Sequence, residues 1–156
     1  MLASGILILV VASVVSLSRF VIKGYAVTIS RTQALYLAQE GQEIVRDIRD
    51  TYWIDGNPDT DFTNLFNFNG PYFANWNPVT GSWVLLAGSE TIPPGTLGPY
   101  QLIQFERIIQ FSDVDLGDSR LNSEVRRVTV TVSWTEGGKS WDVTTETFLT
   151  NWKPEA

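Results

Sequence analysis

The first 18 residues of the chain are mostly apolar and uncharged, and the first charged side chain is Arg19. As a helix rising 1.5 Å per residue, this stretch would measure about 27 Å, close to the ~30 Å hydrocarbon core of a bilayer. The pattern therefore predicts a membrane-spanning helix, with the rest of the chain folded in water. The residues expected to face lipid or neighbouring helices are Ala3, Ser4, Gly5, Ile6, Leu7, Ile8, Leu9, Val10, Val11, Ala12, Val14 and Val15.

Helical spacing continues beyond this apolar stretch, but with a polar side. Gly41 would cost about 1 kcal/mol relative to Ala in a helix, so its place on the apolar stripe indicates close approach of another element. No proline interrupts the chain through residue 57, which predicts one helix over residues 2–50, roughly 70 Å long. Its second half must leave the membrane and be covered by the domain. The stripe expected to pack on a sheet is Leu37, Ala38, Gly41, Ile44, Val45 and Ile48.

Two-residue alternation replaces helical spacing after residue 100. Residues 100–111 read as a strand whose buried face carries residues 103, 105, 107, 109 and 111. Residues 126–134 and 141–149 read as a hairpin around Gly137 and Gly138, because both central residues of a type I′ turn need positive φ. That turn pairs Glu136 with Lys139, Trp134 with Trp141, Val132 with Val143, Thr131 with Thr144, Val130 with Thr145 and Val128 with Thr147.

The intervening residues 51–99 are rich in proline, glycine and aromatic side chains. Residues 73–76 and 82–86 predict a hairpin around a five-residue loop, residues 77–81. The rings either fill the core beneath irregular loops, which is the commoner use, or form a ligand platform.

These patterns predict an α+β fold in which one long N-terminal helix lies on a C-terminal antiparallel β-sheet. The expected divisions are residues 1–50 for the transmembrane helix, 51–99 for the aromatic-rich loop region with its hairpin, and 100–156 for the sheet.

Composition narrows the function. The formal charge is −6, from 17 acidic against 11 basic residues, and no basic cluster occurs, which argues against a nucleic-acid partner. The chain has no cysteine and no histidine, so disulfides, thiolate metal sites and the usual general base are missing. We therefore expect no enzyme, no catalytic residue, no cofactor and no metal centre.

Two acidic clusters are candidates for a calcium site. Residues 55–61 alternate acids like a calcium loop, but Thr60 occupies the place of the turn glycine and Phe66 that of the bidentate acid. The second cluster is Asp113, Asp115 and Asp118. Either could bind calcium weakly, although ordinary turn chemistry is the better interpretation.

Two segments, ALYLAQEGQEIVRDIRD and RRVTVTVSWTEGGKSWDVTTETFLTNWK, resemble minor pilin-like proteins among the type IV pilins and the pseudopilins of type II secretion. The resemblance covers roughly residues 1–54 and 100–153. It implies a pilin-like roll and a filament subunit that waits in the cytoplasmic membrane with its domain outside. The implied partners are membrane lipid, the pilus assembly machinery, and other pilin-like subunits through the N-terminal helix.

The chain departs from that family at its start, where the basic leader and the peptidase cleavage motif are missing. We expect that the sequence begins late. By themselves, the basic residues after the apolar stretch, Arg19, Lys23 and Arg31, predict that the domain lies in the cytoplasm. A basic leader before the stretch would reverse that orientation and put the domain outside.

Two other functions remain open. A monomeric membrane-anchored extracellular binding module, for example for polysaccharide, would use Trp53, Trp76 and Trp83 as exposed coplanar rings. A carboxylate-dependent enzyme would need two buried acids that face one cleft.

Overall fold

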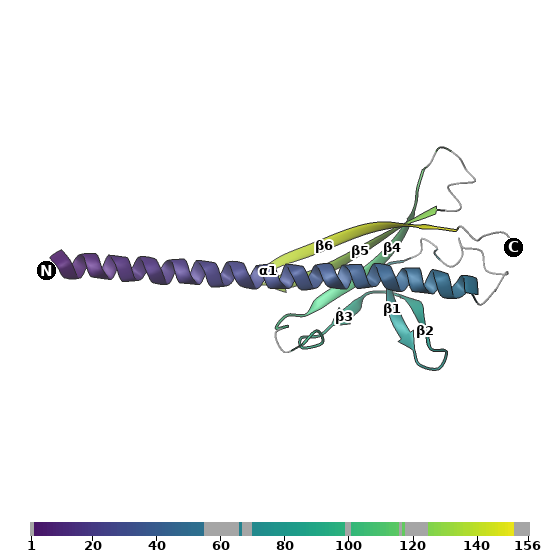
Figure 1. Ribbon diagram of the computed structural model, residues 1–156, viewed down its shortest axis with the longest axis horizontal. Coiled ribbons are helices and arrows are strands. Elements are labelled where there is room, and N and C mark those ends of the chain that lie inside the picture. The colour runs from purple at the N-terminus through teal and green to yellow at the C-terminus, as the bar shows by residue number, and fades with distance from the viewer. Residues whose placement is uncertain are drawn as a thin grey trace.

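The computed structural model describes residues 2–54, 66, 70–98, 101–115, 117 and 125–151, apart from the side chains of residues 2–4 and 23. Figure 1 shows a single long helix, α1 (Leu2–Ile54), whose first half projects freely and whose second half lies along a sheet. Its 53 residues correspond to about 80 Å of continuous helix. It ends four residues later than predicted, and in this added turn the Trp53 ring lies 4.6 Å from the Arg49 guanidinium.

Six antiparallel strands follow α1 and confirm the α+β fold. They pair in the order β2-β1-β4-β5-β6, with β3 added beside β4. Their bounds are β1 (Tyr72–Asn77), β2 (Ser82–Ala87), β3 (Glu90–Ile92), β4 (Phe105–Asp113), β5 (Val125–Glu136) and β6 (Lys139–Thr150).

The hairpin of β5 and β6 has the predicted register throughout, including Trp134 opposite Trp141 and Thr131 opposite Thr144. Gly137 and Gly138 have φ values of 61° and 76°. Both central residues of the turn are thus left-handed, as the type I′ geometry demands. The turn therefore sets the register of 12 consecutive pairs.

Three local predictions were wrong. The strand expected over residues 100–111 begins only at Phe105, because the buried Gln101 side chain bonds the backbone of its own loop. The short strand β3 was not foreseen, since three residues between glycine and two prolines carry almost no periodic signal. The first hairpin has a four-residue loop rather than five, because Asn77 pairs with Ser82 as part of the ladder.

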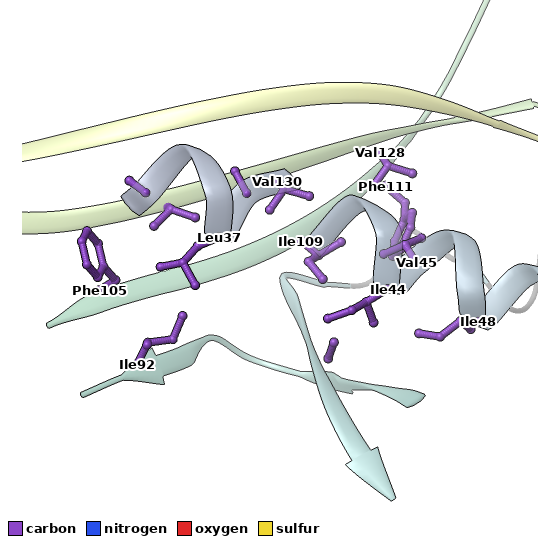
Figure 2. Close-up of a cluster of buried hydrophobic side chains, with 14 of the residues drawn as sticks. Leu37, Ile44, Val45, Ile48, Ile92, Phe105, Ile109, Phe111, Val128 and Val130 are labelled. Carbon is purple, nitrogen blue, oxygen red and sulfur yellow. The ribbon is translucent and has the colours of Figure 1, made fainter. Parts of the chain in front are cut away.

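The core lies between the second half of α1 and the inner face of the sheet. Figure 2 shows Leu37, Ile44, Val45 and Ile48 of the helix gathered in one buried cluster with Phe105, Ile109, Phe111, Val128 and Val130 of β4 and β5. Gly41 allows this approach, because a Cβ atom built there would lie 3.0 Å from Cγ1 of Val130. The completely buried sheet residues of this core are Phe105, Ile109, Val128, Val130, Val132 and Leu149.

Candidate functional site: the exposed apolar half of the helix

The first half of α1 presents large apolar side chains to the outside on every side. Ile6 is 64% exposed, Leu9 69% and Phe20 77%, and every described side chain from Gly5 to Ala26 is exposed. Soluble monomers rarely expose contiguous apolar patches of this size. This surface therefore needs an apolar environment.

Its length and composition suit a bilayer. An 18-residue window has a mean hydropathy of 2.4, and none of that window is buried within the protein. A core helix of a soluble protein would have the same hydropathy but would be covered. The chain thus carries one N-terminal helix, within the part that the structure describes, that is apolar enough to cross a membrane.

Three hydroxyl groups along this part of the helix donate to the helix backbone itself. Ser13 donates to the Leu9 carbonyl at 2.8 Å, Ser18 to the Val14 carbonyl at 2.9 Å, and Thr28 donates to the Gly24 carbonyl at 2.9 Å. An unpaired hydroxyl in hydrocarbon would cost several kcal/mol, roughly 4–8 on transfer to cyclohexane. The back-bonding removes most of that cost, and sequence reasoning did not foresee it.

Small residues leave room for a neighbour. A Cβ atom built at Gly5 or Gly24 would meet nothing within 4 Å, and Ala12 is likewise exposed. Small residues permit close approach between helices in lipid. The predicted packing residues Gly5 to Val15 therefore form an open apolar face, whereas the side chains of Ala3 and Ser4 lie outside the described residues.

The covered half is fastened by a buried cation. Arg107 of β4 is 3% exposed, and its Nη1 donates to Oε2 of Glu40 on α1 at 2.8 Å and to the Leu37 carbonyl at 3.0 Å. Its Nε and Nη2 both donate to Oε2 of Glu90 on β3, at 2.8 and 2.6 Å. One guanidinium thus joins the helix to two strands. The alternation had put Arg107 on the buried face, but not its partners.

Within the described residues, Trp76 and Trp83 are not coplanar, as the binding-module hypothesis requires them to be. Trp76 and Trp83 pair edge to face, with ring centroids 5.4 Å apart and planes at 71°. Trp53 contacts Arg49 instead. Phe66, from the loop region, is completely buried beside Phe111 at 5.1 Å, which is the core use of these rings.

The two described acids of the second cluster have ordinary partners. Asp113 pairs with Arg126 at 3.3 Å, and Asp115 accepts a hydrogen bond from the Gly117 amide, as in an ordinary Asx turn. Within the described residues no group of three or more His, Cys, Asp or Glu side chains could hold a metal ion. Asp118 and the first cluster, residues 55–61, lie outside them.

Comparisons of the chain with protein-family models, with curated proteins and with solved structures gave no match.

Proposed function

We propose that this protein is a structural subunit, of the minor pilin or pseudopilin kind, of a type IV pilus or a type II secretion-like filament. In this proposal α1 first holds the protein in the cytoplasmic membrane with the domain outside. The assembly machinery then withdraws it, and the apolar half exchanges lipid for the helices of other subunits.

One observation supports this proposal most directly, namely that α1 continues without a break from its exposed apolar half into the core of the domain. A tether that only holds a binding module to the membrane has no need of such rigidity. A filament subunit does, because its apolar half must be placed accurately among neighbouring helices while the domain covers them.

The exchange of environments is also energetically plausible. Lipid tails are as apolar as leucine, so replacing lipid by helix contacts changes little hydrophobic free energy. Small residues such as Gly5 and Gly24, which have open space beside them, then favour close helix packing over solvation by lipid.

Fractionation of cells that express the full chain and contain a pilus-type assembly system tests the proposal. Shearing without detergent should release the protein in filaments, whereas a membrane-anchored binding module would stay in the membrane fraction. The proposal fails if the protein is found only in membranes while other subunits of the same system are sheared off.

A matched pair of variants checks that the helix is responsible. Val10→Asp should deplete the protein in both fractions, because an acid near the centre of the uncharged stretch opposes insertion by about 3 kcal/mol. Val79→Asp, on a side chain that is 92% exposed in the first hairpin loop, should leave both fractions unchanged.

A further inference from the structure

One end of the globular domain faces the apolar half of α1. It is built from residues 93–98 and 101–104, which lie between β3 and β4, and from the turn between β5 and β6 (Figure 1). Leu102 and Ile103 meet Ala26 and Ile29 of the helix around a small cavity of about 120 Å³. This contact fixes where the domain begins along the helix axis.

Partly or largely exposed apolar side chains gather at this end of the domain. Leu102 is 83% exposed, Leu97 44% and Trp141 39%. Gln101, itself buried, bonds the Leu97 amide and the carbonyls of Pro93 and Ile103, at 2.7 to 3.0 Å. The loop is therefore internally braced, and its leucines are presented outward by an ordered backbone.

Helix arithmetic brings this end close to the bilayer surface. If the hydrocarbon core ends at Ser18, just before the first charge, Ala26 lies about 12 Å further along the axis. The headgroup layer occupies about 5–7 Å of that distance. An average tilt of about 20° would lower a group that lies ~10 Å from the axis by a further ~3 Å. The length of the Leu102 side chain spans most of what remains.

We propose that this end of the domain docks on the headgroup layer of the same bilayer, with Leu97, Leu102 and Trp141 inserted at the interface. The inference rests on the membrane-held state of the proposed function. Tryptophan is suited to the membrane–water interface because its ring is apolar and carries one polar N–H group. Leucine is suited to the apolar side of the same interface. The domain then leans toward its sheet side and touches lipid at two loops.

Apolar contact, rather than charge, provides the attraction. Lys139, the cation of the turn, stands opposite Glu136 in the hairpin register, so the two formal charges cancel. Docking should accordingly occur on uncharged phosphatidylcholine and should resist salt.

Site-specific quenching tests the contact, and the absence of cysteine in the chain makes labelling simple. Leu102→Cys in the full chain is labelled with a bimane and reconstituted into phosphatidylcholine vesicles that contain lipid with a nitroxide near the headgroup. Val79→Cys, in the loop between β1 and β2, is the control. Figure 1 shows that the β1–β2 hairpin lies away from the end of the domain that faces the apolar half of α1. Both side chains are exposed, so neither substitution disturbs the core.

Bimane at position 102 should be quenched at least about twofold more strongly than at position 79, because groups held at the interface lie within 5–10 Å of the acyl boundary. High salt should leave this difference unchanged. Val14→Cys in the span reports the membrane-held state separately. Quenching at 14 with equal quenching at 102 and 79 overturns docking alone, whereas absence of quenching at 14 overturns the membrane-held state as well.

Discussion

Arg107 should contribute strongly to the stability of the domain, and its replacement by methionine is the sharpest test of how α1 is held. Methionine fills much of the same volume but donates no hydrogen bond. The change removes four contacts to the two carboxylates and to the Leu37 carbonyl. The loss in free energy of unfolding depends on whether water can hydrogen-bond the acceptors that Arg107 leaves.

The exposure of the two partners sets the magnitude. Breaking a fully buried ion pair costs about 3–5 kcal/mol, because one charge stays buried and unpaired. Here the side chains of Glu40 and Glu90 are 55% and 29% exposed, so both carboxylates regain water when Arg107 is lost. We therefore expect Arg107→Met to lower the free energy of unfolding by about 2 kcal/mol, less than for a fully buried pair.

Replacing the more buried acid, Glu90, should destabilise the domain more than replacing Glu40. Glu90→Gln, which keeps an acceptor oxygen but removes the negative charge opposite Arg107 at a largely covered site, should cost about 1–2 kcal/mol. Glu40→Gln should cost less than about 1 kcal/mol, as is usual for exposed pairs, and its effect should shrink in high salt.

Urea unfolding of the full chain in uncharged detergent micelles, followed by near-ultraviolet circular dichroism of the tryptophans, measures these differences. The reasoning is refuted if Arg107→Met unfolds at the wild-type midpoint, or if Glu40→Gln is more damaging than Glu90→Gln. A double-mutant cycle between positions 40 and 107 isolates the pair.

Three further predictions use the same unfolding assay. Gly41→Leu should destabilise by more than about 2 kcal/mol despite a better helix propensity, because Val130 stands 3.0 Å from the new Cβ, whereas Gly24→Ala, with open space around it, should cause no loss. Val130→Ala should cost about 2 kcal/mol from lost burial and the cavity left behind, and Val79→Ala on the exposed loop should stay within about 0.5 kcal/mol of wild type. Gly138→Ala should cost about 1 kcal/mol, because φ at this position is 76° and alanine adopts that conformation only under strain.

Elements with a strong local period were predictable from the sequence. The helix and the hairpin of β5 and β6 each combine a long repeat with an unambiguous signal, the lack of proline in one and the Gly137-Gly138 turn in the other. A two-residue period also reveals which face of β4 is buried, because Phe105, Ile109 and Phe111 share it. Local sequence preferences were enough to predict an element wherever tertiary contacts favour the same structure.

Features that depend on distant residues were missed. Glu90 belongs to β3, a strand of only three residues. This strand is stabilised by backbone pairing with β4 and by the ion pair between Glu90 and Arg107. Gln101 ends the predicted strand early because its side chain takes over hydrogen bonds that a ladder would otherwise make. Neither β3 nor the late start of β4 can be recognised from a window of neighbouring residues. The first depends on partners elsewhere in the chain, and the second depends on the conformation of one side chain.

The helix also shows how one element can serve two solvents. The hydroxyls of Ser13, Ser18 and Thr28 each donate to a carbonyl of the same helix, which lowers the cost of placing them in lipid or against neighbouring helices. Its polar half places Glu40 on Arg107 and thereby ties the rod to the sheet. A force applied to the domain is therefore transmitted along continuous helical hydrogen bonds to the apolar half. Under the proposed function, withdrawal from the membrane then requires only that Leu102 and its neighbours release the interface, while the fold itself stays intact.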